Sequence, residues 1–246
     1  RSEPLWPQEA LNKDFADVEK AGFQIHVHAI GDAGVNEALN ALAYAQDQNG
    51  ASDYRNAITH VQLVEDSDFA RFKDLGVIAA VNPYWAEKDD YYYDLQVPFL
   101  GQERADKEYP IQSFLSNGAM IVTASDFPVT NPPDPLTAIE LGVTRSTPDL
   151  LLPYVTSDPS DPKFKEPLWP EEAVSLEDMI ASATYNGAYA NFLESVCGSI
   201  EVGKSADMVI LDQDLFKIEP SEISKSKVLL TLFQGKEVYR AEAYTD

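Results

Sequence analysis

The amino-acid sequence predicts an α/β protein built on a parallel sheet. The first half of the chain alternates short β-rich runs with segments whose apolar residues recur at helical spacing, which is the pattern of βαβ units. The chain has 246 residues, of which 44% are hydrophobic, enough for one large domain or one domain with a small appendage. Wholesale disorder is not expected for such a composition.

The amino-terminal part of the chain predicts one complete β-α-β unit. Residues 14–22 have a helical pattern, and residues 24–30 form the first expected strand. The next helix is expected over Ala33 to Gln48, where the apolar residues of one face are Val35, Leu39, Leu42 and Ala43. A second strand is expected from about Ala57 to Val64.

A third helix and a third strand extend the same pattern. The helix carries Phe69, Phe72 and Leu75 at helical spacing and stops at Gly76, a common residue after the last turn of a helix. The strand covers Val77 to Val81. The chain thus predicts three successive strands that pair in parallel.

Two long segments interrupt this alternation. Residues 84–109 contain Trp85, the run Tyr91 to Tyr93 and several acids, and a loop of that length is usually a lid, a binding segment or a disordered stretch. The aromatic residues there are consistent both with loop packing and with a wall of a substrate site. Residues 146–170 hold six prolines and predict an ordered loop or partial cover.

Between and after these segments the pattern resumes. A helix is expected near Pro110 to Asn117, followed by a fourth strand from Met120 to Ser125. The next helix begins at Asp134-Pro135, an acidic N-cap followed by proline at the first helical position. Ser175 to Asp178 resembles a capping box, and the helix that it opens is expected to reach Phe192. Beyond Gly198 the chain predicts short strands and turns.

Composition excludes several classes of function. With 41 Asp and Glu against 18 Lys and Arg, the net charge of −23 repels phosphate backbones and anionic lipid, so neither nucleic acid nor a membrane is expected as the main partner. The one cysteine, Cys197, cannot form an internal disulfide. Neither a leader pattern nor a run of 18 apolar residues is found, so a cytoplasmic protein is the expectation.

The residues that carry chemistry stand at the ends of three expected strands. All three histidines of the chain fall on the first two of these strands, as His26, His28 and His60. The fourth strand ends in Asp126. The carboxyl ends of parallel strands form the functional mouth of α/β folds, which puts His28, His60 and Asp126 on one face.

Two imidazoles and a carboxylate suit a divalent metal, most simply zinc. Zinc lowers the pKa of a coordinated water to near neutrality, and Asp126 would take the proton of that water as general base of a hydrolysis. The residues alone therefore predict a metal-assisted hydrolase on a parallel barrel.

Other interpretations of the same residues stay open. A strand histidine is more often a satisfied core residue than a ligand, and for His26 the two interpretations weigh about equally. Asp126 would also suit a turn before Pro128. Asp32 is interpreted mainly as the N-cap of the helix that begins at Ala33.

Five segments of the chain form a familiar set: His28 to Asp32, Thr59 to Gln62, Ser125 to Val129, Thr184 to Ala190 and Gly198 to Asp207. In this order they resemble the C-terminal part of amidohydrolase family 3, the YtcJ-like metal-dependent hydrolases of the amidohydrolase superfamily. Each motif is weak alone, but five in register are specific. The resemblance covers nearly the whole chain from about residue 14.

The resemblance implies strands 5 to 8 of a TIM-like (β/α)8 amidohydrolase barrel, with part of a small β-sandwich. Residues 1–195 would form the barrel portion, and residues 196–246 the strand tail that joins the sandwich. By the same resemblance His28 and His60 would be metal ligands, and Asp126 would bind metal and activate water. His26 has no matching role in the family.

The family's first strand carries a His-x-His pair, and its fourth strand carries a bridging lysine or another ligand. Neither is found upstream of residue 24, so the chain is expected to be the C-terminal half of a longer enzyme. A site of two histidines and one carboxylate would bind zinc more weakly than the full cluster. Open strand edges would favour pairing with a second copy, so a homo-oligomer is among the expected partners.

Two functions follow as hypotheses. The first is a metal-dependent hydrolase of a carbon-nitrogen bond in a small molecule of the amide type, with Asp126 passing the proton to the leaving nitrogen. The second is a non-catalytic binding or regulatory module that kept the fold. Metal content separates the two, because the active parent protein requires a metal and a binding module does not.

Overall fold

A computed structural model describes residues 6–130, 132–242 and 244, arranged in two compact units. The first unit comprises the chain up to Asn82 together with Lys107–Ala124, and the second comprises Pro83–Asp106 together with the chain from Ser125 onward. The expected portions 1–195 and 196–246 include residues 1–5, 131, 243 and 245–246, which lie outside the described residues. Grouping by contacts does not test the boundary expected at residue 195.

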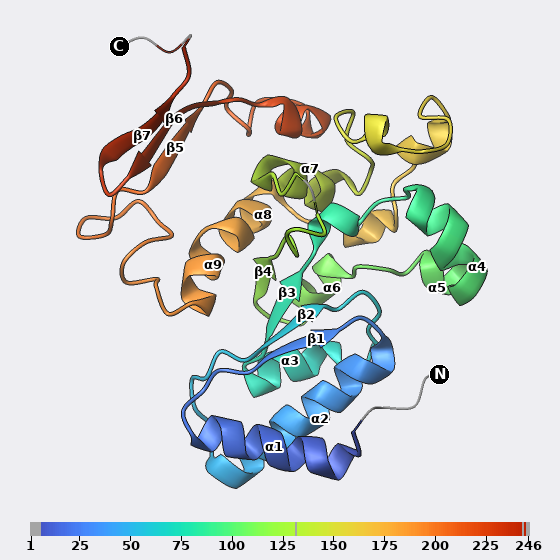
Figure 1. The fold of residues 1–246 in the computed structure, drawn as a ribbon, viewed down its shortest axis with the longest axis vertical. Coiled ribbons are helices and arrows are strands. Elements are labelled where there is room, and N and C mark those ends of the chain that lie inside the picture. Colours follow the sequence, from blue (N-terminus) through green and yellow to red (C-terminus); the bar gives the residue numbers. More distant parts are fainter. Residues whose placement is uncertain (1–5, 131, 243, 245–246) are drawn as a thin grey trace. The chain divides into compact units, whose positions relative to one another are not determined.

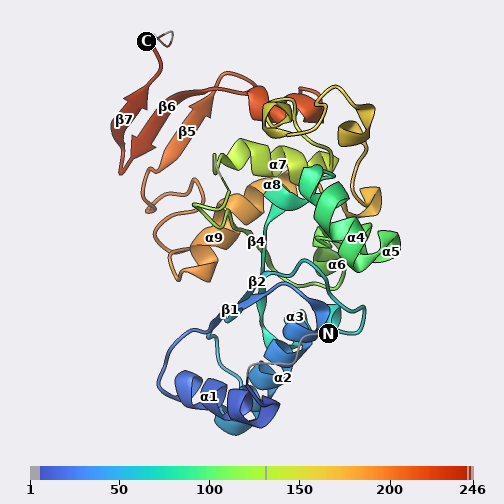
Figure 2. The ribbon, with the colours of Figure 1, turned by 45° about the vertical axis from the view of Figure 1, so that its right-hand side comes forward.

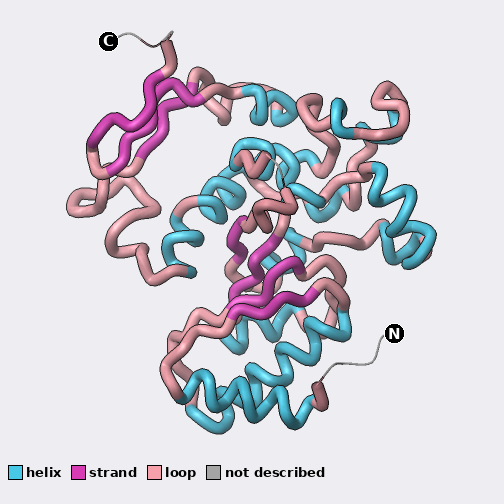
Figure 3. Tube along the Cα trace, viewed as in Figure 1, coloured by secondary structure: helices cyan, strands magenta, loops and turns pink. Residues whose placement is uncertain are grey.

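The first unit contains the parallel sheet that the sequence predicts. Its strands pair in the order β1 (His26–Ala29), β2 (Ala57–His60), β3 (Ile78–Val81) and β4 (Ile121–Thr123), all parallel (Figures 1 and 3). The β2 and β3 strands are buried along almost their whole length, as expected for a parallel sheet covered by helices.

The second strand is shorter than expected because its backbone leaves the extended region. It was expected to reach Val64, but it ends at His60. His60 and Val61 have φ of 73° and 45°, a left-handed conformation that cannot continue a ladder. Strand β2 therefore ends in a sharp turn at His60 and Val61.

The helices of the first unit are α1 (Gln8–Lys20), α2 (Asp32–Asn49), α3 (Phe69–Leu75) and α6 (Ile111–Ser116). Helix α1 lies along α2, and α2 and α3 contact the sheet (Figure 2). The predicted stop at Gly76 is confirmed, since this residue caps α3 with φ 66°. The assignment of Asp32 as N-cap is wrong: Gly31 is the cap, and Asp32 is the first helical residue, whose Oδ1 accepts from Ala33 N at 2.7 Å.

The second unit contains residues 84–106 of the first long segment, the second long segment, a group of helices and the carboxyl-terminal strands. The segment after β3 is largely helical rather than a plain loop: 3-10 helix η1 (Pro83–Trp85), π-helix η2 (Tyr92–Gln96), α4 (Val97–Leu100) and α5 (Gln102–Ala105). Residues 146–170 hold the short 3-10 helices η3 (Leu152–Tyr154) and η4 (Pro162–Lys165), and η5 (Pro170–Glu172) begins at their end. A further 3-10 helix, η6 (Pro220–Lys225), follows much later in the chain.

The longer helices of this unit begin where the sequence predicts. Helix α7 (Pro135–Thr144) is capped by Asp134, whose Oδ1 accepts from Leu136 N at 3.1 Å. Ser175 caps α8 (Leu176–Ala183) by accepting from Asp178 N at 3.1 Å, so the capping residue is confirmed.

The single helix expected from Ser175 to Phe192 is wrong. It breaks at Thr184, with φ −124° and ψ −89°, and a second helix, α9, covers Tyr185–Ala190. The Thr184 hydroxyl donates to the Ile180 carbonyl at 2.7 Å, a local hydrogen bond of the kind that bends or ends helices.

The tail forms a small antiparallel sheet of β5 (Met208–Leu211), β6 (Val228–Phe233) and β7 (Lys236–Arg240). The turn between β6 and β7 is Gln234-Gly235, and both residues have positive φ, which suits a two-residue hairpin turn. Among the described residues, no helix is long and apolar enough to cross a membrane.

An aromatic cluster fixes α3 and α6 of the first unit. The ring of Phe114 is fully buried and meets Phe69 and Phe72 edge to face, at centroid distances of 5.1 Å and 4.8 Å.

We expect Phe114→Ala to lower the free energy of unfolding by about 3–5 kcal/mol, because it leaves a cavity in this cluster. Urea denaturation measures the change. Phe23→Ala, at a ring 65% exposed, serves as the control, and equal losses in both variants would contradict this packing.

Candidate active site

The first unit brings His28 and His60 together at the carboxyl end of its sheet. Their ring centroids are 4.5 Å apart and their planes are inclined by 75°. His28 is exposed, whereas His60 is only 3% exposed. The prediction that these two histidines lie together on one edge of the sheet is therefore confirmed.

The backbone at the end of β2 explains how the rings meet. In the strand register His28 pairs with Thr59, and His60 pairs with Ala29, so in regular strands the two histidines would point to opposite faces. The positive φ of His60 departs from the strand conformation and brings its ring beside His28. Such conformations cost about 1–3 kcal/mol each and gather at functional sites.

A chain of hydrogen bonds orients the buried histidine. Asn82, directly after β3, donates from Nδ2 to the carbonyl of Ala124, directly after β4, at 2.9 Å. This fixes the amide so that its Oδ1 faces His60 Nδ1, also at 2.9 Å. A carbonyl oxygen only accepts, so His60 Nδ1 donates to it, and in the neutral imidazole Nε2 is then the nitrogen without a proton.

In this tautomer the unprotonated Nε2 has a lone pair that can coordinate a metal. Metal-binding histidines usually donate the other ring N–H to an oxygen, which orients the ring and raises the basicity of the coordinating nitrogen. The His28 and His60 side chains, with Asn82 behind His60, therefore fit a divalent metal. Asn82 did not figure among the predicted site residues. Its position just after a strand, like that of the other strand-end residues, is the signal that points to it.

The third predicted residue, Asp126, belongs to the second unit, two residues after Ala124 in the chain. Its φ is 54°, a left-handed conformation like that of His60. The turn after it is closed by its main-chain carbonyl, which accepts from Val129 N at 2.8 Å. The backbone of Asp126 therefore supports its interpretation as a turn residue. The turn is closed by the main-chain carbonyl of Asp126 and not by its carboxylate.

Among the residues that the structure describes, no group of three or more His, Cys, Asp or Glu side chains is placed to hold a metal ion. The metal-ligand set of His28, His60 and Asp126 therefore stays a prediction. Of these three residues, the first unit brings His28 and His60 together. His26 is exposed on β1, so its interpretation as a core residue is wrong.

In the second unit, the two long segments are bound to each other. Asp90 accepts from the hydroxyls of Thr156 and Ser157 at 2.8 Å and 2.6 Å and from both backbone N–H groups. Partial burial acts to raise the pKa of Asp90, but these hydrogen bonds outweigh it and lower the pKa to about 2. Tyr93 stacks edge to face on Phe164 at 5.8 Å, which adds an apolar contact between the segments.

The amidohydrolase family model matches residues 1–239, so the chain belongs to the amidohydrolase family. Its resemblance to YtcJ-like members is also confirmed: the putative amidohydrolase YtcJ of Bacillus subtilis is 24% identical over 94% of this chain and 40% of its own length. Protein LONG AFTER FAR-RED 3 of Arabidopsis thaliana is 33% identical over 96% of this chain and 37% of its own length.

An N-substituted formamide deformylase of Arthrobacter pascens is 27% identical over 88% of this chain and 36% of its own length. Among solved structures, an uncharacterized metal-dependent hydrolase of Pyrococcus furiosus matches with a TM-score of 0.64 and 26% identity, over 88% of this chain and 39% of that one. The chain thus spans about two fifths of the length of these four proteins.

We expect Asn82→Ala to weaken zinc binding by about 10–100-fold, because His60 loses the acceptor that fixes its tautomer. Competition with a zinc-binding dye measures the affinity. Asn117→Ala, at an exposed position of the same unit, should leave it unchanged. Equal affinity of the Asn82 variant and the parent protein would contradict the role of the amide.

Proposed function

We propose that this chain forms the C-terminal part of a metal-dependent hydrolase, with strands 5 to 8 of a (β/α)8 barrel and part of a β-sandwich. Support comes from the four parallel strands in sequential order and from the coverage of about two fifths of each relative. The observation that carries the proposal is the pair of His28 and His60, with Asn82 behind the buried ring.

The proposed ligands of the metal are His28, His60 and Asp126, and the proposed metal is zinc. Zinc, when bound, supplies a positive charge that acidifies water and polarises the bond to be broken. The donor set of imidazoles and a carboxylate suits zinc better than magnesium or calcium, which prefer oxygen ligands. The solved metal-dependent hydrolase of Pyrococcus furiosus supports a divalent metal in this fold.

The chain's own side chains have separate tasks in this proposal. His28 and His60 bind through ring nitrogens, and Asn82 holds the His60 ring in the required tautomer. The Asp126 carboxylate accepts the proton of the attacking water and passes it to the leaving nitrogen, so that a neutral amine departs.

The proposed substrate is a small molecule with an amide-type carbon-nitrogen bond. The similarity to an N-substituted formamide deformylase supports this class, and so does a 24% identical imidazolonepropionase of Bdellovibrio bacteriovorus. The two long segments, joined through Asp90, are the proposed place where the acyl or amine group is selected. A second copy of the chain is the proposed partner for the open edges of the sheet.

We expect Asp126→Asn in the zinc-loaded full-length protein to lower kcat by about 10²–10⁴-fold on N-substituted formamides, since the proton acceptor is lost. Release of formate measures the rate. Asp66→Asn, at an exposed turn, is the matched control and should retain full activity.

Two outcomes oppose the proposal. Equal rates of parent and Asp126→Asn would exclude Asp126 as the proton acceptor. A parent protein that neither retains zinc nor hydrolyses any of a panel of amides would instead support the non-catalytic module.

A further inference from the structure

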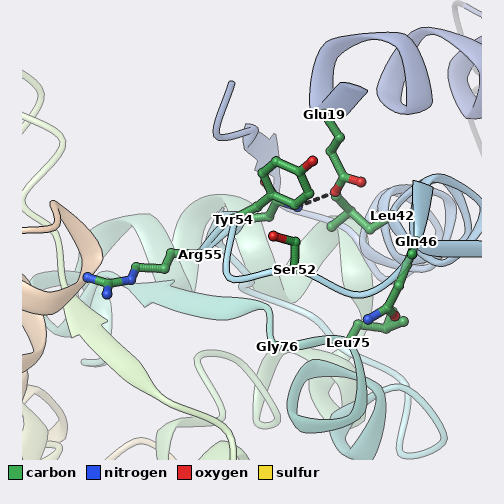
Figure 4. A pocket seen from close by; sticks show the side chains of 10 residues that line it. Glu19, Leu42, Gln46, Ser52, Tyr54, Arg55, Leu75 and Gly76 are labelled. Atoms are coloured by element: carbon green, nitrogen blue, oxygen red, sulfur yellow. Dashed lines mark hydrogen bonds between the residues drawn. The ribbon is translucent and has the colours of Figure 1, made fainter. Parts of the chain in front are cut away.

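A small polar cavity lies in the first unit at the end of the sheet opposite to His28 and His60. It is lined by residues at the end of α1, along α2, in the loop before β2 and at the turn between α3 and β3 (Figure 4). Its volume is about 10 Å³, enough for one particle of the size of a water molecule. No step of the proposed hydrolysis uses it.

The feature that makes this cavity a binding site is the carboxylate of Glu19. Glu19 is only 3% exposed. Its Oε1 accepts from Asn56 Nδ2 at 2.6 Å, whereas its Oε2 is buried with no hydrogen-bond partner in the described part of the chain. A buried carboxylate oxygen without a donor costs free energy of folding, so a donor or a cation is expected there.

The neighbouring amide cannot turn to supply a second donor. Asn56 Oδ1 accepts from the backbone N–H of Ile25, at the start of β1, at 2.8 Å. This bond fixes Nδ2 toward Glu19. The orientation of Asn56 is therefore set by the backbone. The other amide that acts on Glu19, Asn49, lowers its pKa and donates from Nδ2 to the carbonyl of Ala16 at 2.9 Å, and Oε2 has no hydrogen-bond partner among the described residues.

The chain also offers Glu19 no cation within the described residues. The one basic side chain that lines the cavity, Arg55, has its guanidinium bound to Asp53 at 3.1 Å and directed away from Glu19 (Figure 4). A water molecule would satisfy the hydrogen bond but leave the buried charge uncompensated. A proton on the carboxyl would remove the charge but leave the cavity unfilled. A monovalent cation both compensates the charge and fills the cavity.

We propose that this cavity binds one monovalent cation of about the size of a water molecule, potassium or ammonium, with Glu19 Oε2 as its anionic ligand. The lining also offers the oxygen-bearing side chains of Gln46, Ser52 and Tyr54. Through Asn56, the bound cation stabilises the attachment of α1 to the start of β1 and β2.

The test is thermal unfolding in chlorides of potassium, ammonium and tetramethylammonium at one ionic strength. Potassium and ammonium should raise the unfolding midpoint by about 2–4 °C in a saturable manner, while tetramethylammonium, which is too large for the cavity, should not. Glu19→Gln should lose this difference. Asp14→Asn, at an exposed carboxylate of the same helix, should keep it.

Acidity gives a second readout. Burial raises the pKa of Glu19, so the folded state holds the proton of this carboxyl more tightly than the unfolded state does. Without a bound cation, the free energy of unfolding therefore falls as pH rises from the pKa of Glu19 in the unfolded state to its pKa in the folded state. A cation that binds the carboxylate opposes this loss, and the potassium effect should therefore grow with pH. Tyr54 and Arg55 are the other titratable side chains that line the cavity.

If Glu19→Gln does not fold, thallium(I) resonance on the parent protein replaces the variant. A bound thallium signal that potassium displaces would support the site. Identical midpoints in all three salts, a potassium effect that survives in Glu19→Gln, or no bound thallium would each overturn the proposal and leave a water molecule or a proton as the occupant.

Discussion

The hydrogen-bond chain from His60 through Asn82 to the Ala124 carbonyl is the interaction on which the candidate site depends. It joins the carboxyl ends of β2, β3 and β4, three strands that are neighbours in the sheet. Because one end is a backbone carbonyl, the direction of every donor in the chain is fixed. The sheet thereby decides which nitrogen of His60 would face the proposed metal.

The same edge concentrates unfavourable backbone conformations. His60 and Val61 both have positive φ, and neither of them is a glycine. A sheet with a well-packed interior can offset such costs, and Ile58, Ala79 and Ile121 on three successive strands are fully buried. The opposite end of the sheet shows a second polar arrangement, in which Asn56 connects Glu19 with the start of β1.

The sequence is informative where one local pattern decides the outcome. The apolar runs and helix stops predicted four parallel strands and most of the helices, and the strand-end positions of His28 and His60 predicted that they lie together. The turn at His60, the break at Thr184 and the part played by Asn82 could not be predicted in this way. Each depends on hydrogen bonds or backbone angles that a residue pattern does not encode, such as the bond of Asn82 to a carbonyl 42 residues away.

The tautomer of His60, determined by long-range ¹H–¹⁵N NMR on the metal-free protein at a pH at which the imidazole is neutral, is the most direct test of this hydrogen-bond chain. We expect a proton on Nδ1, held by Asn82 Oδ1, and an unprotonated Nε2. A proton on Nε2 would mean that the amide of Asn82 is turned the other way, and the sheet would then not prepare His60 to bind a metal.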